Sequence, residues 1–405
     1  MTDLKQLADP SKFEFHPQPL EDGLGNSYTL NTGIDIGYGS LKVMSKYGLH
    51  KVPSLVIPFV RPKYGDITAL QDVYMGRDDI LYIENMGTEE EQVWAVGQKA
   101  LDTLDATKAV LDVDEYYNKK WFLNKEFQIM FNIGVFLAQL RADRNLDSWI
   151  TNYHICIGLP VQWVKYSEEL KKCLAGRRSF DVMFGNGNLQ HVSFEVGIGD
   201  LEVIPQHEGA LNSQLLDYQG NIQDKLDFAH KDVLLVDAGN RTVDAHLLLK
   251  NNKGKSKTWL DVSMLSVKDE VCEYILEETD NEREVYEYQL DKYILGEDPC
   301  TIKCGRNVID FKSTLQASIR DKIRVLSKRL QMVYNLDDLD SILVTGGTGL
   351  CYFDELKDIF DDYDVQLVQD LDGEVPYNAT YSNVVGFYKL LVYLEKSKLD
   401  PQKKK

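Results

Sequence analysis

The sequence has few residues of the kinds that build metal clusters, disulfide scaffolds or membrane spans. Its 405 residues include only six cysteines and seven histidines. Only Cys300 and Cys304 lie close together, and without a second pair or a nearby histidine this spacing favours structural thiols over a metal or redox site. No run of about 18 apolar residues is present, and the first residues lack the apolar core of a signal peptide, so we expect a cytoplasmic protein without a membrane partner.

Basic residues are also scarce. The chain carries 45 Lys and Arg against 64 Asp and Glu, which gives a formal net charge of −19. Proteins that wrap DNA or RNA depend on basic side chains that neutralise phosphates. We therefore expect no direct nucleic-acid binding, and any role on DNA would run through another protein.

What is present fits a two-domain α/β protein. Apolar residues make up 43% of the chain and charged residues 27%, and the length favours two cores over one. Short β-rich apolar runs alternate with stretches of helical periodicity. The pattern predicts three strands within 28–57, a hairpin over 180–197 and strands at 232–237 and 340–345. It predicts amphipathic helices over 119–142, 310–333 and 379–395.

The expected domain organisation follows from this pattern. Residues 1–27 are polar and contain three prolines, which indicates an extension ahead of the folded body. The first domain is predicted over 28–206 and completed by a C-terminal helix at 379–397. The second domain is predicted over 207–378, and 398–405 is predicted to be a basic, solvated tail.

An internal similarity is the most informative feature. The segments GIDIGYGSLKVMS at 33–45 and LLVDAGNRTVDAHLL at 234–248 share one plan of strand, Asp-x-Gly, turn and strand. A polar residue falls seven positions after each aspartate, at Lys42 and at Asp244. The two copies lie about half the chain apart, as a duplicated domain would place them.

The composition of these hairpins suits phosphate and Mg²⁺. Glycines such as Gly37, Gly39 and Gly239 let phosphate oxygens approach backbone N–H groups. Carboxylates at strand ends, here Asp35 and Asp237, suit Mg²⁺, which keeps several waters and is held beside substrate phosphates by one or two acids. Either copy alone is better explained by an ordinary hairpin turn; the presence of two copies shifts the balance toward a phosphate site.

A third glycine turn adds to the pattern. SILVTGGTGLCYFDEL at 341–356 is a buried strand, a Gly346–Gly347 turn and a helix start. A backbone without side chains at this point lets a purine or ribose lie against it. A plain strand-to-helix turn is the alternative.

In this order, GIDIGYGSLKV, VIPQHEGA, LLVDAGNRTVD and LVTGGTG resemble the phosphate 1, connect 1, phosphate 2 and adenosine motifs of the actin, heat-shock chaperone and sugar kinase superfamily. KVPSLVIP, VWAVGQKA and VPYNATYSNVVGFYK resemble bacterial and archaeal actin-like proteins of the ParM plasmid-segregation type. The resemblance spans about 30–395. It implies an actin-like two-lobed α/β fold with duplicated mixed five-stranded sheets and helices, and ATP with Mg²⁺ in the cleft between the lobes.

The resemblance also implies roles for individual residues. Asp35 and Asp237 would hold Mg²⁺ through water, Asp237 also facing the attacking water, which Gln206 would orient. The first hairpin would contact the β- and γ-phosphates and the second the γ-phosphate. The phosphate-binding set is Gly37, Tyr38, Gly39, Ser40 and Lys42 in the first hairpin, and Gly239, Asn240, Arg241 and Thr242 in the second.

Other assignments concern the nucleoside. Gly346, Gly347 and Thr348 would flank the adenosine, and Lys322 would reach the ribose or base. Lys322 belongs to a charged stripe that is also typical of a helix's solvated face. His207, beside Gln206, could be a base or a bystander.

The resemblance leaves three functions to compare. The first is a filament-forming ATPase, or GTPase, whose hydrolysis is slow because an amide at Gln206 orients water but cannot act as a strong base. Such proteins polymerise with themselves and segregate plasmid DNA through a DNA-binding adaptor. A small-molecule kinase needs an acid that serves as base for the acceptor hydroxyl, and a chaperone needs a long substrate-binding region; the sequence identifies neither. The second phosphate motif reads Asp-Ala-Gly-Asn-Arg-Thr where a Gly-Gly-Thr-Thr type run is common, which leaves ATP or GTP preference open.

Overall fold

The structure is a computed structural model, and it divides the chain into two compact units. It describes residues 29–399 except 60–74, 108–120, 142–144, 147–149, 151, 186, 226, 229, 251, 281–284, 295, 297, 305–306 and 374. The predicted extension over 1–27 and residues 400–405 of the predicted tail lie outside the described residues. Among those described, the first unit comprises 29–212, 216–221 and 384–399, and the second comprises 213–215 and 222–383.

The first unit contains a mixed five-stranded sheet in the order β10-β7-β1-β2-β3. The strand β1 pairs antiparallel with β2 and parallel with β7. Strands β2 and β3 are antiparallel, and β7 and β10 are parallel. The bounds are β1 (Thr29–Ile36), β2 (Ser40–Ser45), β3 (Gly48–Pro53), β7 (Asn152–Leu159) and β10 (Leu201–Pro205).

The second unit repeats this sheet. Its order is β13-β12-β11-β16-β17, and each neighbouring pair has the same sense as its counterpart in the first unit. The strand β11 takes the place of β1, and β16 takes that of β7. The predicted duplication is therefore confirmed. The bounds are β11 (Val233–Ala238), β12 (Val243–Leu249), β13 (Asn252–Trp259), β16 (Ser341–Thr345) and β17 (Val365–Leu367).

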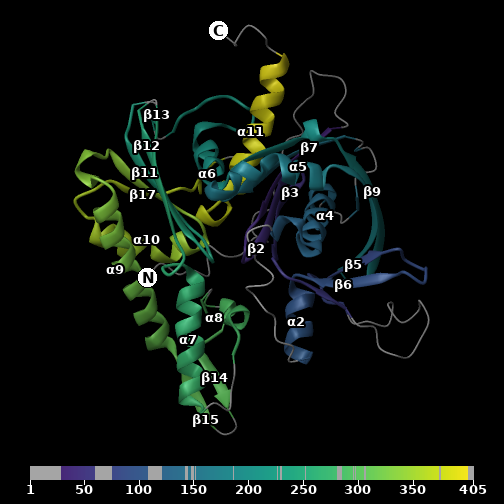
Figure 1. The fold of residues 1–405 in the computed structure, drawn as a ribbon, viewed down its shortest axis with the longest axis horizontal. Coiled ribbons are helices and arrows are strands. Elements are labelled where there is room, and N and C mark those ends of the chain that lie inside the picture. The colour runs from purple at the N-terminus through teal and green to yellow at the C-terminus, as the bar shows by residue number, and fades with distance from the viewer. Residues whose placement is uncertain are drawn as a thin grey trace. The chain divides into compact units, whose positions relative to one another are not determined.

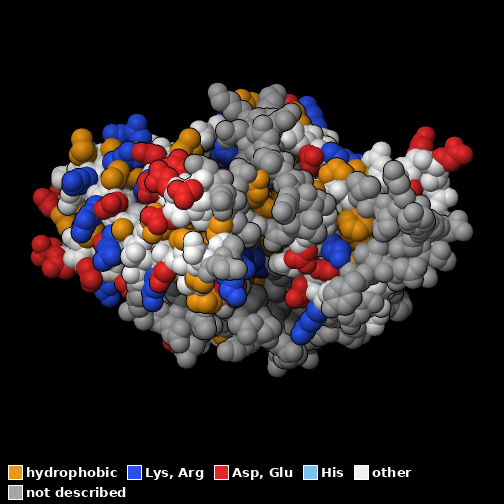
Figure 2. Space-filling view, turned by 90° about the horizontal axis from the view of Figure 1, so that it is seen from below, with side chains coloured by type: hydrophobic (Ala, Val, Ile, Leu, Met, Phe, Trp, Pro, Cys, Tyr) orange, Lys and Arg blue, Asp and Glu red, His pale blue; other side chains and the backbone are white. Residues whose placement is uncertain are grey.

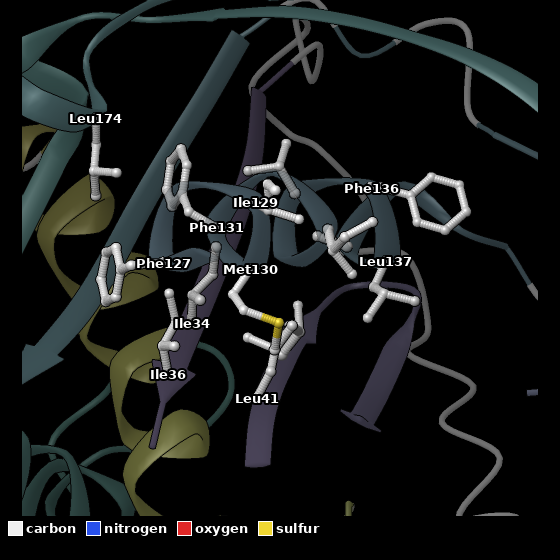
Figure 3. Close-up of a cluster of buried hydrophobic side chains, with 14 of the residues drawn as sticks. Ile34, Ile36, Leu41, Phe127, Ile129, Met130, Phe131, Phe136, Leu137 and Leu174 are labelled. Carbon is white, nitrogen blue, oxygen red and sulfur yellow. The ribbon is translucent and has the colours of Figure 1, made fainter. Parts of the chain in front are cut away.

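The helix α4 (Lys125–Gln139) forms the centre of the first unit's core. Its apolar side chains lie over those of β1 and β2, as Figure 3 shows. A Cβ on Gly134 would lie 3.1 Å from Cδ1 of Ile34, so the glycine allows α4 to approach β1 closely. The predicted bounds of 119–142 were too wide. The helix begins only at Lys125, because Asn124 has extended backbone angles. A short 3-10 turn, Trp121–Leu123, precedes it.

A second five-stranded sheet in the first unit was not predicted. Its order is β4-β6-β5-β8-β9, with every pair antiparallel. It contains the predicted hairpin of 180–197, which is longer than expected. The strands are β4 (Val56–Pro58), β5 (Ile80–Glu84), β6 (Gln92–Val96), β8 (Gly176–Phe184) and β9 (Asn188–Val196). Besides α4, the unit contains α2 (Gln98–Thr107), α5 (Ser167–Leu174), most of α6 (Gln206–Leu215) and most of α11 (Ser382–Leu399).

In the second unit the long helices α7 (Met264–Glu278) and α9 (Lys312–Val333) run side by side (Figure 1). The helix predicted over 310–333 and the strand predicted over 340–345 are thus confirmed as α9 and β16. The remaining elements are α8 (Asp291–Ile294), α10 (Gly347–Ile359), β14 (Thr301–Cys304) and β15 (Asn307–Asp310). Cys300, just before β14, and Cys304, its last residue, are free thiols, and burial raises the pKa of Cys300.

The surface adds two observations. On the face drawn in Figure 2, acidic and basic side chains are interspersed over the coloured residues. Within the part of the chain that the structure describes, no helix is both long and apolar enough to cross a bilayer.

Candidate functional site

The turn after β1 is tightly closed by its own backbone. The N–H of Gly37 donates to the carbonyl of Ser40 over 3.1 Å, and the N–H of Ser54 donates to the carbonyl of Gly39 over 3.3 Å. A Cβ on Gly37 would lie 3.3 Å from the Ser40 carbonyl oxygen. The turn therefore favours glycine and leaves bare backbone at the end of β1.

Asp35, at the end of β1, is the centre of a polar cluster in the first unit. The ladder places it directly opposite Lys42, whose Nζ lies 3.1 Å from Asp35 Oδ2. Gln206, the first residue of α6, donates from Nε2 to Asp35 Oδ1 over 3.2 Å. Asp35 is 3% exposed, so these two donors compensate a buried carboxylate.

A glycine makes room for Gln206. A Cβ on Gly158, near the end of β7, would lie 2.7 Å from Gln206 Cγ and 2.4 Å from Cζ of Phe387. The parallel strands β7 and β10 end at the same edge of the sheet as β1, and α6 begins directly after β10. The topology thus brings Gln206 to Asp35.

Tyr38, the residue between the two glycines of the first turn, packs against tryptophans. Its ring stacks on Trp121 with the centroids 5.6 Å apart and contacts the edge of Trp163 at 6.5 Å. These contacts fix the turn to the core of the first unit.

The turn after β11 has the same backbone closure as the first. The N–H of Gly239 donates to the carbonyl of Thr242 over 2.8 Å, and a Cβ on Gly239 would lie 3.3 Å from that oxygen. Asp237 is the last residue but one of β11, the position that Asp35 has in β1. Its Oδ2 accepts from Nδ2 of Asn383, in the first turn of α11, over 3.2 Å.

The residue across the ladder differs between the two hairpins. Asp35 faces a lysine, whereas Asp237 faces Asp244. The Asp244 carboxyl is buried and accepts from the hydroxyls of Thr242, over 2.9 Å, and Thr258. Burial raises the pKa of Asp244, and these hydrogen bonds only partly offset it.

The raised pKa gives a stability prediction. A carboxyl whose native-state pKa lies above its unfolded value destabilises the fold once the pH exceeds the native value, and this cost disappears at acid pH. We expect Asp244→Asn to raise the urea midpoint at pH 7.5 and to have a smaller effect at pH 4. Equal midpoint shifts at both pH values would show that Asp244 is not a strained carboxylate.

The Gly346–Gly347 turn lies beside the second hairpin because β16 pairs parallel with β11. Gly346 has a φ of +87°, and a Cβ there would lie 2.2 Å from the carbonyl oxygen of Ala238. Thr348 donates from Oγ1 to the carbonyl of Gly239 over 2.7 Å. The predicted adenosine and phosphate 2 segments therefore form one compact cluster in the second unit.

Asn240 and Arg241 occupy the tip of the second hairpin and are both half-buried. The carbonyl of Asn240 accepts from the N–H of Leu265 over 2.7 Å. Its side-chain Oδ1 accepts from Lys268 Nζ over 3.1 Å. The hairpin tip is therefore attached to the first turns of α7.

Lys322 and His207 lie on helices and not in the glycine turns. Lys322 lies on α9, where its Nζ is 2.5 Å from Glu270 of α7. This ion pair is a structural role for Lys322 that the sequence did not predict. His207 follows Gln206 in α6 and is buried.

The structure thus assembles the predicted residues into two clusters, one in each unit. The first joins Asp35, Lys42 and Gln206, and the second joins the turns after β11 and β16. Asn383 and Lys268 were missed. Asn383 lies in VPYNATYSNVVGFYK, a segment that resembles the actin-like proteins. Lys268 is a single lysine in an amphipathic helix, and the sequence gives no sign of its role.

The family described as actin-like proteins, N-terminal domain, matches residues 33–209. No curated protein matches the sequence.

Several solved structures have the same fold. A non-polymerisable quadruple mutant of pCBH ParM is 17% identical, with a TM-score of 0.66 over 89% of this chain and 98% of that one. ParM from a 15-stranded Clostridium botulinum filament is 18% identical, with a TM-score of 0.65 over 90% and 99%. Bacillus thuringiensis ParM with AMPPNP is 16% identical, with a TM-score of 0.58 over 91% and 99%. The fold is accordingly the two-lobed actin-like fold.

Proposed function

We propose that this chain, which has the actin-like fold of ParM and matches the actin-like N-terminal domain family over residues 33–209, binds ATP with Mg²⁺, hydrolyses it slowly and assembles with itself into filaments. The proposal rests on one observation above all. In each of two hairpins, which lie in separate sheets, the first strand leads into Asp-x-Gly. The N–H of that glycine donates to the carbonyl three residues later and so closes the turn. Duplicated glycine turns beside a carboxylate suit a chain of phosphates with a hydrated cation.

The residues present fit Mg²⁺ held through water and phosphate. The described residues contain no group of three or more His, Cys, Asp or Glu that could hold a metal ion by itself. Mg²⁺ needs no such cage, since one or two carboxylates and substrate phosphates suffice. Asp35 and Asp237 would hold it, and the ion would neutralise charge on the phosphates. Lys42, already beside Asp35, would add a positive charge there.

The remaining residues supply binding and orientation. The backbone of the Gly37–Ser40 and Gly239–Thr242 turns would donate to the phosphates. Gly346, Gly347 and Thr348 would lie along the adenosine. Gln206 would orient the attacking water; a neutral amide is a poor base, so turnover should be slow and rest on positioning.

The cellular role follows from filament assembly. One of the similar structures is a filament of a Clostridium botulinum ParM. We propose that the polymer of this chain segregates plasmid or other DNA through a DNA-binding adaptor. The net charge of −19 supports an indirect contact, because a surface of this sign repels the phosphate backbone.

The test is nucleotide-dependent assembly. Light scattering and pelleting should rise on addition of Mg-ATP, or of Mg-GTP if the chain prefers guanine, and should fall again as nucleotide is consumed. EDTA should prevent the rise. Protein that stays in the supernatant at tens of micromolar with either nucleotide would contradict filament formation, and turnover that required an added sugar or acid would indicate a kinase instead.

A further inference from the structure

Lys268 is a buried lysine with a specific task in the second unit. It lies on α7, its side chain is 3% exposed, and its Nζ contacts Asp291 Oδ1 at 2.6 Å as well as Asn240 Oδ1. A buried ammonium costs several kcal/mol unless it is paired and hydrogen-bonded. Asp291 supplies the charge partner, and Asn240 supplies a neutral acceptor at the tip of the hairpin.

The chemistry of the amide makes this contact directional. A lysine ammonium only donates, so it selects the oxygen of the Asn240 carboxamide and not its nitrogen. The amide is planar, and fixing Oδ1 on Lys268 leaves the two N–H donors of Nδ2 on its other arm. Without the lysine, the amide could rotate by half a turn and present its oxygen in place of its nitrogen.

The backbone holds the same residue. The carbonyl of Asn240 accepts from the N–H of Leu265, one of the first-turn donors of α7 that have no partner within the helix. Leu265 and Lys268 are three positions apart and therefore share a face of α7. Main chain and side chain of Asn240 are thus both held by one helix face.

We infer that Lys268 is a positioning residue that fixes the Asn240 amide so that it donates from Nδ2 to the terminal phosphate of a bound nucleoside triphosphate. This inference rests on the proposed function, and on the expectation from the sequence that the second hairpin contacts the γ-phosphate. Such a role for the amide would also explain why the second phosphate motif has Asn240 where a glycine is common. A flipped amide would turn a carbonyl oxygen toward the phosphate and repel it.

Binding of Mg-AMPPNP and Mg-ADP, measured by calorimetry, tests the inference. Lys268→Met keeps the length of the side chain and should weaken Mg-AMPPNP binding about tenfold, the value of a hydrogen bond to a charged group, with little change for Mg-ADP. Asn240→Gly should do the same. Lys292→Met removes an exposed lysine that pairs with Asp298 and should leave both affinities unchanged.

The double variant separates positioning from charge. If Lys268 acts through Asn240, Lys268→Met combined with Asn240→Gly should lose no more affinity than either alone. Losses that multiply, or equal losses for the two nucleotides, would overturn the inference. Asn240→Asp is a second probe that retains the acceptor for Lys268 and should weaken Mg-AMPPNP more than Mg-ADP.

Failure of the two proposals is distinguishable. Wild-type protein that binds neither nucleotide at millimolar concentration would overturn the proposed function and the inference with it. Wild-type protein that prefers Mg-AMPPNP, with the same preference retained in Lys268→Met, would overturn the inference alone.

Discussion

Asp237→Asn should lower the rate of nucleotide hydrolysis at least about a hundredfold while the protein remains folded. The carboxylate lies near the end of β11, beside the closed turn of the second hairpin, where we propose that the metal and the attacking water lie. Removing one charged group from a preorganised reacting centre commonly costs 10²–10³-fold in rate. The asparagine has the same shape and retains an oxygen that can accept from Asn383.

The matched control for this substitution is Asp261→Asn. Asp261 is an exposed aspartate of the same unit that forms a bidentate pair with Arg329. Its loss should leave hydrolysis within about twofold of wild type, since exposed ion pairs contribute little. Phosphate release at saturating nucleotide measures both variants. An Asp237→Asn protein with a wild-type rate would remove Asp237 from the reacting centre.

Gly346→Ala should destabilise the protein by about 3 kcal/mol and abolish nucleotide binding. The φ of +87° is unfavourable for alanine, and the added Cβ would lie 2.2 Å from the carbonyl oxygen of Ala238 and 2.9 Å from Oδ1 of Asp237. Backbone strain and overpacking each cost about 1–3 kcal/mol. The clash is with backbone, so β11 and the Gly239 turn would have to move. Urea denaturation and nucleotide titration measure the two effects.

Substitutions at two other glycines separate the cost of backbone strain from the cost of a steric clash. Gly176 has a φ of +116° with nothing within 4 Å of an added Cβ, and Gly199 has equally open surroundings without a positive φ. Gly176→Ala should cost about 1 kcal/mol from backbone strain alone, and Gly199→Ala should be close to neutral. A Gly346→Ala protein no less stable than Gly176→Ala would show that the approach of the Gly346 turn to β11 is not tight.

Local patterns predicted the hairpins well because they are local structures. Each Asp-x-Gly turn is encoded within a few residues, and a short turn fixes the register that places Lys42 opposite Asp35 and Asp244 opposite Asp237. The duplicated sheet order follows from the same repetition. The antiparallel sheet of the first unit was missed because strands such as Val56–Pro58 are too short to show a period.

Contacts between distant segments could not be predicted in this way. The hydrogen bond from Gln206 to Asp35 joins residues 171 positions apart, and that from Asn383 to Asp237 joins residues 146 apart. Both depend on which strands are neighbours in the sheet and on where a following helix begins. Likewise, the role of Lys268 becomes visible only when α7 is packed against the second hairpin.

Electron cryomicroscopy of the protein incubated with Mg-AMPPNP would test nucleotide binding and filament assembly together. We expect filaments in which density for the triphosphate contacts the backbone of both the Gly37–Ser40 and the Gly239–Thr242 turns, with Asp35 and Asp237 facing a Mg²⁺ ion through water. Nucleotide density that contacted neither turn, or single particles without nucleotide at saturating Mg-AMPPNP, would contradict this expectation.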